Sequence, residues 1–281
     1  MIEPLPDLLI APVVRAALAE DLGRAGDVTA QACVPAEARL SAIFRTRKDG
    51  VVAGLACARL AIAEMDPAAD FRATAEDGQA VAAGATLAVV EANARALLSA
   101  ERTALNLLGR LCGIATLTAE YVKAVQGTAA LIVDTRKTTP GLRALEKYAV
   151  RCGGGVNHRF GLDDAILIKD NHIAACGSVG EAVRRAKAAA GHLMKVEVEI
   201  DGLGQLEEAL KYGPDVVMLD NFTLEDLAEA VKRTAGRATL EASGGVNLST
   251  VRAIAETGVD VISVGALTHS VGVLDIGLDA A

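Results

Sequence analysis

Tryptophan is absent from this chain of 281 residues, and aromatic residues make up only 2% of it. A core built on large aromatic rings is therefore excluded. Apolar residues nevertheless reach 52%, so a sizeable core must pack through Ala, Val, Leu and Ile. Short β-branched runs alternate with Ala-rich stretches, which is more typical of an α/β protein than of an all-β protein.

The chain also lacks a hydrophobic run long enough for a membrane helix. Its longest stretch without charge, residues 261–274, has 14 residues and includes His269, whereas a spanning helix requires roughly 18 residues. The N-terminal dozen residues contain acids and prolines but no basic region, so they do not form a signal peptide. We therefore expect a cytoplasmic protein with no membrane partner.

Paired cysteines are missing as well. The five cysteines are widely spaced and odd in number, and no two form a C-x-x-C pair: they are Cys33, Cys57, Cys112, Cys152 and Cys176. This argues against a disulfide framework and a cysteine-based zinc site, and we interpret Cys152 as a structural thiol rather than a nucleophile. The net charge of −8 argues against a nucleic-acid partner.

The first part of the chain is predicted to be a small α+β unit. Residues 42–47, 51–54 and 79–90 have the pattern of strands, separated by the turn-forming pairs Asp49-Gly50 and Asp77-Gly78. Leucines and alanines then recur every three or four residues, which predicts a helix over residues 93–125. We assign residues 1–112 to this first domain.

A second domain, residues 113–267, repeats short apolar runs separated by helical stretches. The predicted strands are residues 131–133, 165–168, 196–200, 216–219, 238–240 and 261–264. Ser178-x-x-Glu181 and Thr223-x-x-Asp226 are typical of helix starts. A succession of βα units this long predicts parallel strands in a barrel or partial barrel.

Polar residues follow all six of these predicted strands. Reactive groups of a βα barrel lie at the C-terminal ends of its strands, so the six polar ends predict one shared mouth. The segments are 134–137, 169–172, 199, 220–221, 243–245 and 265.

Basic residues outnumber acidic residues between Asp134 and His172, although the whole chain is acidic. Guanidinium groups bind carboxylates through two hydrogen bonds, and lysines bind phosphate as point charges, so we expect a small ligand with several negative charges. The candidate ligands, all in loops or at strand ends, are Arg136, Lys137, His158, Arg159 and Lys169. Four further charged residues stand at helical spacing, and we interpret them as ordinary ion pairs on a solvated helix face: Arg143, Glu146, Lys147 and Arg151.

Glu199 and Asp220 end two separate predicted strands. Carboxylates there suit a ribose diol, a Mg²⁺ ion or a developing positive charge. Lys195, Glu197 and Glu199 alternate along one strand and are expected on the same face. We take Glu199 as the ligand and expect Glu197 to pair with Lys195.

Glycine-rich turns follow the last two strands, at Ser243-Gly244-Gly245 and Val264-Gly265-Ala266. Glycines after barrel strands allow backbone N–H groups to approach a phosphate. The same residues also form plain tight turns, but two such turns on neighbouring strands favour a phosphate monoester site.

These segments together resemble the quinolinate phosphoribosyltransferases. The similar stretches are ERTALNLL (101–108), DTRKTTPGLR (134–143), GGGVNHRFGLDDAILIKDNH (153–172), VEVE (196–199), LDNF (219–222), EASGG (241–245) and VDVISVGALTHS (259–270). The resemblance implies an N-terminal α/β sandwich domain, to which the tail at about 268–281 returns, and an incomplete α/β barrel. It also implies a Mg²⁺-dependent transferase of NAD biosynthesis, which converts quinolinate and phosphoribosyl pyrophosphate to nicotinate mononucleotide, pyrophosphate and CO₂.

The resemblance further implies a homodimer with shared active sites, possibly assembled into a higher oligomer, and a role for each matching residue. Arg102 would reach the partner's site and bind quinolinate with Arg136, His158 and Arg159, beside Thr135. Lys137 and Lys169 would lie between quinolinate and the pyrophosphate, and Glu199 and Asp220 would face the ribose and its Mg²⁺. The 5′-phosphate would be held by Ser243, Gly244, Gly245, Val264, Gly265 and Ala266.

Three alternatives stay open on the residues alone. A paralogue of the same fold, such as the molybdate-transport-associated relatives, would accept another substrate. Lys169 at a strand end would suit a Schiff-base lyase. A non-catalytic sensor of phosphorylated metabolites would use the same anion site without turnover.

Overall fold

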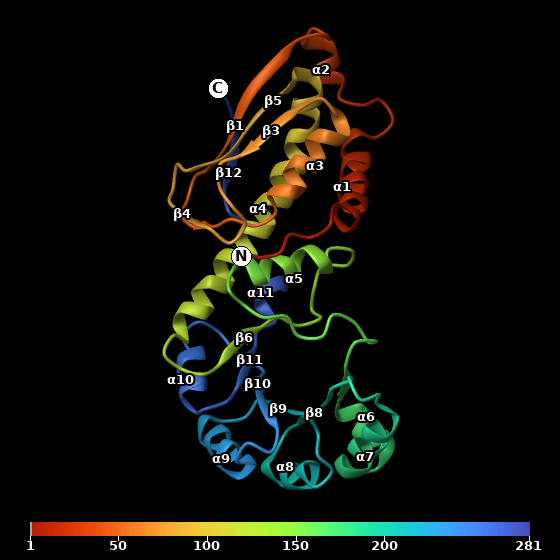
Figure 1. The fold of residues 1–281 in the computed structure, drawn as a ribbon, viewed down its shortest axis with the longest axis vertical. Helices are drawn as coiled ribbons and strands as arrows, with labels where there is room; N and C mark the ends of the chain where they lie inside the picture. The colour runs from red at the N-terminus through yellow and green to blue at the C-terminus, as the bar shows by residue number, and fades with distance from the viewer. Residues whose placement is uncertain (1) are drawn as a thin grey trace. The chain divides into compact units, whose positions relative to one another are not determined.

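The computed structural model describes residues 2–281, which form two compact units (Figure 1). The first unit comprises the chain up to Ala119 together with Thr138–Gly154 and Leu267–Ala281. The second unit comprises Glu120–Lys137 and Gly155–Ala266. A segment from the middle of the chain and the C-terminal tail therefore both belong to the N-terminal unit.

The first unit contains a four-stranded antiparallel sheet in the order β12-β1-β5-β3. The strands are β1 (Arg39–Thr46), β3 (Asp70–Ala73), β5 (Thr86–Asn93) and β12 (Ile276–Ala280). Burial alternates along β1, where Ala42, Phe44 and Thr46 are buried, so one face of the sheet carries the core. The helices α1 (Asp7–Leu22), α3 (Leu55–Met65) and α4 (Ala94–Ala124) lie on the same side of this sheet (Figure 1).

Two strand predictions in this unit were wrong in extent. Residues 51–54 contribute only Val51 to a strand, because Gly54 adopts φ 93° and α3 begins at Leu55. The Asp77 carboxylate accepts the N–H groups of Gly54 and Leu55 at this helix start. Residues 79–90 form β4 (Ala80–Val81) and β5, separated by a turn at Gly84 with φ 84°. β4 pairs with β2 (Gly50–Val51) rather than with the main sheet.

The helix α5 (Arg143–Cys152) corrects the prediction of a solvated charged face. Glu146 is fully buried and Lys147 is 2% exposed. Arg110 of α4 donates to Glu146 Oε1 through Nε at 2.9 Å and Nη2 at 2.6 Å. The Glu146 carboxylate therefore pairs with a residue of another helix. The spacing of charges within α5 cannot indicate such a pair. The remaining helices of the first unit are α2 (Val28–Cys33) and α11 (Ala266–His269).

The second unit contains a six-stranded parallel sheet in the order β6-β11-β10-β9-β8-β7. The strands are β6 (Leu131–Val133), β7 (Ile166–Ile168), β8 (Val196–Ile200), β9 (Val216–Asp220), β10 (Thr239–Ser243) and β11 (Val261–Ser263). Because β6 and β7 are the two edges of this sheet, the predicted α/β fold with a partial parallel barrel is confirmed.

Helices connect successive strands of the second unit: α6 (Asp170–Cys176), α7 (Val179–Ala189), α8 (Leu203–Leu210), α9 (Leu224–Thr234) and α10 (Val251–Glu256). Both predicted helix starts are confirmed. Ser178 Oγ accepts the N–H of Glu181 at 3.2 Å, and Thr223 Oγ1 accepts the N–H of Asp226 at 3.1 Å. Among residues 2–281, each helix is too short or too polar to span a membrane.

Candidate active site

A cavity of about 470 Å³ opens in the second unit. Nine of the predicted site residues line it: Thr135, Arg136, Lys137, His158, Arg159, Lys169, Glu199, Asp220 and Ser243. Four further residues complete the lining: Leu167, Met218, Glu241 and Ser263. The predicted convergence of polar strand ends is therefore what the fold produces.

The parallel sheet positions these side chains at one edge. Residues 135–137 follow β6, Lys169 follows β7, and Asp220 and Ser243 end β9 and β10. In register, Glu199 of β8 and Glu241 of β10 both lie opposite Met218 of β9. Side chains two residues apart on a strand share a face, so Glu241 and Ser243 point to the same side, as do Met218 and Asp220.

The cationic wall of the cavity contains two neighbouring guanidinium groups, those of Arg136 and Arg159. Burial lowers the pKa of Arg159, and the positive charge of Arg136 lowers it further. Arg159 Nη1 donates to Ala165 O at 3.1 Å, whereas its buried Nε has no hydrogen-bond partner. A carboxylate bound between the two guanidinium groups would relieve their repulsion and accept this hydrogen bond.

Two accessible carboxylates, those of Glu199 and Asp220, line the same cavity. Glu199 forms an ion pair with Lys169. Asn221 adopts φ 55° and donates from Nδ2 to Asp220 Oδ2 at 2.8 Å, which orients that carboxylate. A Cβ at Gly244 would collide with Asn221 Oδ1, so the turn after β10 requires glycine there.

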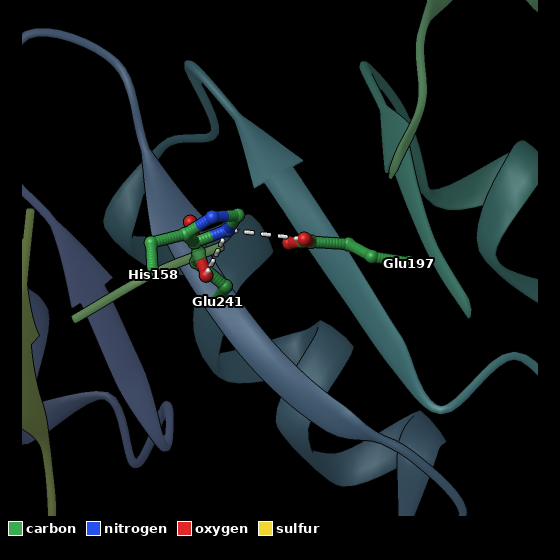
Figure 2. Close-up of side chains that lie close together, drawn as sticks. All are labelled: His158, Glu197 and Glu241. Atoms are coloured by element: carbon green, nitrogen blue, oxygen red, sulfur yellow. Dashed lines mark ion pairs between the residues drawn. The ribbon is translucent and has the colours of Figure 1, made fainter. Parts of the chain in front are cut away.

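His158 lies between two buried glutamates, Glu197 and Glu241 (Figure 2). Its Nε2 is 3.0 Å from Glu197 Oε2 and 3.4 Å from Glu241 Oε2. The predicted Glu197–Lys195 pair was wrong: β8 begins at Val196, and Lys195 lies 3.8 Å from Asp215 with a side chain 74% exposed. The alternation of the strand therefore does not extend to Lys195.

Opposing effects act on the protonation of this cluster. Burial alone would lower the pKa of His158, but hydrogen bonds to Glu197 and Glu241 outweigh it and raise the pKa to about 10. The N–H of Arg159 lies 2.8 Å from Nδ1, and the two carboxylates face Nε2. Burial also raises the pKa of Glu197, and Glu241 raises it further, while the hydrogen bond from His158 lowers it.

Two sets of donors in this unit have the chemistry to bind a cation. Donor atoms of His158, Glu197 and Glu241 lie within 4.8 Å of one another, but Nε2 already faces both carboxylates. Glu199 and Asp220 instead line the open cavity. Their hard oxygen atoms suit Mg²⁺, which prefers one or two carboxylates together with phosphate oxygens.

Six predicted site residues do not line this cavity. Five belong to the turns after β10 and β11: Gly244, Gly245, Val264, Gly265 and Ala266. The N–H of Val264 donates to Val133 O at 2.9 Å, so this N–H group forms a hydrogen bond of the parallel sheet rather than pointing to a ligand. Arg102 is an exposed residue of α4 and lines a separate cavity of about 120 Å³ in the first unit, with Glu20 and Asp21.

Glu197, Glu241 and Ser263 belong to the site although they were not predicted as site residues. Glu241 stands two residues before Ser243 in β10, so alternation within that strand was a usable signal. No local signal pairs Glu197 with His158, because the two residues belong to different elements. Leu167 and Met218 line the cavity as ordinary apolar strand residues.

A second cavity of about 750 Å³ lies in the first unit and includes Arg59, Asp77 and Tyr148 in its lining. The Asp77 carboxylate already has hydrogen-bond partners. It accepts hydrogen bonds from the N–H groups of Gly54 and Leu55 at the start of α3, and from the Tyr148 hydroxyl at 2.7 Å. The lining of this second cavity does not contain the cluster of guanidinium and ammonium groups that lines the 470 Å³ cavity.

Comparisons with known proteins identify the family of the chain. The family model described as quinolinate phosphoribosyl transferase, C-terminal domain, matches residues 114–279, and the corresponding N-terminal domain matches residues 27–112. The chain is 51% identical over 271 residues to the nicotinate-nucleotide pyrophosphorylase [carboxylating] of Mycobacterium leprae, covering 95% of each chain. It is 47% identical over 260 residues to a probable enzyme of that name from Bacillus subtilis, covering 92% of this chain and 89% of the relative.

A solved structure shares the whole fold. The nicotinate-nucleotide pyrophosphorylase of Francisella tularensis superposes with a TM-score of 0.95 at 40% identity, covering 100% of this chain and 99% of that one. Both family models, the identity over nearly the full length and the cavity at the strand ends lead to one conclusion: the chain belongs to the quinolinate phosphoribosyl transferase family.

Proposed function

We propose that this chain transfers the phosphoribosyl group of phosphoribosyl pyrophosphate to quinolinate and releases nicotinate mononucleotide, pyrophosphate and CO₂. Family membership supports the two substrates. The observation that carries the proposal is the cavity itself, whose lining combines guanidinium and ammonium groups with two accessible carboxylates. Such a cavity suits an acceptor with two carboxylates beside a phosphorylated sugar.

In this proposal, Arg136 and Arg159 bind the carboxylates of quinolinate. Their mutual repulsion and the buried Arg159 Nε favour an anionic ligand between them. Arg102 of the partner subunit adds a third guanidinium group. Lys137 and Lys169 lie between the acceptor and the pyrophosphate, beside Thr135.

The donor substrate occupies the acidic side. Glu199 and Asp220 hold the ribose and the Mg²⁺ that accompanies the pyrophosphate, and the 5′-phosphate is bound by the turns after β10 and β11. The residues of these turns are Ser243, Gly244, Gly245, Gly265 and Ala266. Gly244 and Gly245 adopt φ 91° and 61°, so their backbone presents N–H groups in a conformation that other residues rarely adopt.

The reaction proceeds in two steps, transfer of the phosphoribosyl group and then loss of CO₂. The ring nitrogen attacks C1 of the ribose while the bond from C1 to the pyrophosphate oxygen breaks, and the carboxylates stabilise the cationic sugar in the transition state. The lysines stabilise the negative charge of the departing pyrophosphate, and a Mg²⁺ ion held by Glu199 and Asp220 would supply further positive charge there. The alkylated ring then accepts the electron pair of the breaking C–CO₂ bond, and Lys137 donates a proton to that carbon.

We further propose that the chain functions as a cytoplasmic homodimer in which each site uses Arg102 of the partner subunit. The ion pair of Lys169 with Glu199 suits a lysine that binds anions as an ammonium group. A Schiff-base lyase, in contrast, requires a neutral lysine nucleophile.

The test is an assay of the purified protein with quinolinate, phosphoribosyl pyrophosphate and Mg²⁺, with nicotinate as a parallel acceptor. We expect equal amounts of nicotinate mononucleotide, pyrophosphate and CO₂ from quinolinate, and little product from nicotinate. Chelation of Mg²⁺ should stop the reaction. Folded protein that binds phosphoribosyl pyrophosphate but forms no product from quinolinate would refute the proposed acceptor.

A further inference from the structure

The guanidinium group of Arg110, on α4, binds three separate segments of the first unit. Its Nη2 donates to Thr139 Oγ1 at 2.8 Å, to Glu146 Oε1 at 2.6 Å and to Thr268 O at 2.9 Å. Its Nε also donates to Glu146 Oε1, at 2.9 Å. Thr139 and Thr268 lie 29 and 158 residues from Arg110 in the sequence, so one side chain joins distant parts of the chain.

The first of these segments continues directly from the candidate active site. Thr139 follows Lys137 by two residues, and residues 134–139 form neither a helix nor a strand. Thr139 is held at two atoms, because its N–H donates to Glu146 Oε2 at 3.0 Å and its Oγ1 accepts from Arg110. The cluster around Arg110 therefore fixes the chain just beyond Lys137.

The second segment continues from the turn after β11. Thr268 is fully buried in α11 and follows Ala266 by two residues. The strands that precede the two segments, β6 and β11, are paired neighbours in which Ile132 lies opposite Ile262. Arg110 thus binds the continuations of two adjacent strands, each shortly after a group of predicted site residues.

Neutralising the buried Glu146 carboxylate does not account for this arrangement. One cation of any shape would provide the opposite charge that a buried carboxylate requires. The hydrogen bonds to Thr139 and Thr268 are additional, and they use the branched, planar donor set that arginine has and lysine lacks. The pattern indicates a residue that fixes the spacing of two segments as well as balancing a charge.

We propose that Arg110 is a positioning residue of the transfer reaction, which holds the segment carrying Lys137 at a fixed spacing from the turn of residues 264–266. This inference rests on the proposed function, in which Lys137 binds near the pyrophosphate and the turn binds the 5′-phosphate of the same donor molecule. A donor bound at both ends reacts efficiently only if its two binding groups are correctly spaced. The described residues that line the 470 Å³ cavity do not include Arg110, so it acts through the chain at Thr139 and Thr268.

Three variants separate positioning from stability. Arg110→Lys retains a cation for Glu146 but replaces the branched guanidinium group with a single ammonium group. Thr139→Val keeps the shape of the side chain and the backbone hydrogen bond to Glu146, and removes only the hydroxyl bound by Arg110. Thr118→Val is the matched control, because Thr118 is also fully buried and its hydroxyl bonds only to Ile114 O of its own helix, at 2.8 Å.

Steady-state kinetics with saturating quinolinate give kcat and the KM for phosphoribosyl pyrophosphate. We expect Arg110→Lys to lower kcat about 100-fold and to raise this KM about 10-fold, because both segments lose their common anchor. Thr139→Val should lower kcat about 10-fold and change the KM by less than about 3-fold, because only the segment of Lys137 is released. Thr118→Val should stay within about 2-fold of the wild-type protein in both constants.

A purely structural role would give a different result. Circular dichroism reports the Tm of each variant, and kinetics are measured well below it. If Arg110→Lys and Thr139→Val have a lower Tm but wild-type kcat and KM, the proposal is overturned. If Arg110→Lys does not fold, Thr139→Val decides, because its change leaves the ion pair of Arg110 with Glu146 intact.

Calorimetry of phosphoribosyl pyrophosphate binding, without an acceptor, keeps the test separate from the proposed function. Its Kd should rise about 10-fold in Arg110→Lys, since the spacing of the two binding groups affects the donor alone. Wild-type protein that binds this donor but forms no product from quinolinate refutes the proposed acceptor and leaves this measurement valid. An unchanged Kd in folded Arg110→Lys would refute the positioning role of Arg110.

Discussion

At the scale of single residues, burial separates the charges that stabilise the fold from those that face the cavity. Glu146 is fully buried and bound by Arg110 and by the N–H of Thr139, whereas the Lys169 side chain is 45% exposed at its pair with Glu199. Both are ion pairs between common residue types. The first is part of the interior, where removing one partner costs several kcal/mol, and the second is available to a ligand.

The cysteines provide a prediction at this scale. Burial raises the pKa values of Cys57, Cys112 and Cys152 to about 12. Thiolate is the reactive form, and its fraction at pH 8 falls about tenfold for each unit by which the pKa rises. In the native protein, iodoacetamide should therefore label the exposed Cys33 first and the half-buried Cys176 more slowly, leaving the three buried cysteines unmodified.

Peptide mapping by mass spectrometry identifies the labelled positions, and the protein unfolded in guanidinium chloride should react at all five cysteines. Labelling of native Cys152 at the rate of Cys33 would contradict its interpretation as a structural thiol.

At the scale of elements, close packing of the long helix α4 depends on glycine. The C-terminal segment crosses this helix, where the N–H of Leu274 donates to Gly109 O at 2.9 Å. A Cβ on Gly113 would collide with the carbonyl oxygen of Gly272. The backbone of the segment can thus approach the helix only because Gly113 has no side chain.

We predict that Gly113→Ala lowers the stability of the protein by about 1–3 kcal/mol, as overpacking typically does. Thermal unfolding followed by circular dichroism should show a lower Tm. Gly204→Ala is the matched control: it lies in α8, has nothing within 4 Å of its added Cβ, and should leave the Tm unchanged or raise it slightly. Equal Tm values for wild-type protein and Gly113→Ala would show that the segment does not pack as described.

At the scale of the whole molecule, the proposed site draws on more than one chain. Arg102 is exposed on α4 of the first unit and is absent from the lining of the 470 Å³ cavity in the second unit. Its proposed role therefore depends on assembly into a dimer.

Hybrid dimers test this role. Arg102→Ala and Lys169→Ala should each be inactive alone, because each removes one ligand from both sites of a dimer. After mixing and subunit exchange, half of the dimers are hybrids with one intact site, so about a quarter of the wild-type activity should return. Subunit exchange is verified with two differently tagged proteins. If exchange is complete and no activity returns, the site is not shared between subunits.

Much of the fold was predictable because parallel βα units have local signals. Each strand of the second unit is a short apolar run, and the helix starts at Ser178 and Thr223 carry their own capping residues. Where the prediction was wrong, at residues 51–54 and 79–90, tertiary contacts decided the ends of the strands. The Asp77 carboxylate, for example, binds the start of α3 from more than twenty residues away.

By itself, the sequence determined the fold class, the six polar strand ends and nine of the residues that line the cavity. The fold class, the strand ends and seven of these residues follow from local periodicity and from the rule that strand ends of a parallel sheet meet, whereas His158 and Arg159 follow from the basic character of residues 134–172. Only the tertiary structure decided which charges are buried and which partners they have: Glu146 with Arg110, Lys195 with Asp215, and His158 between Glu197 and Glu241. The physical reason is that the partner of a buried charge is set by proximity in space, and the sequence within each strand or helix does not contain that proximity.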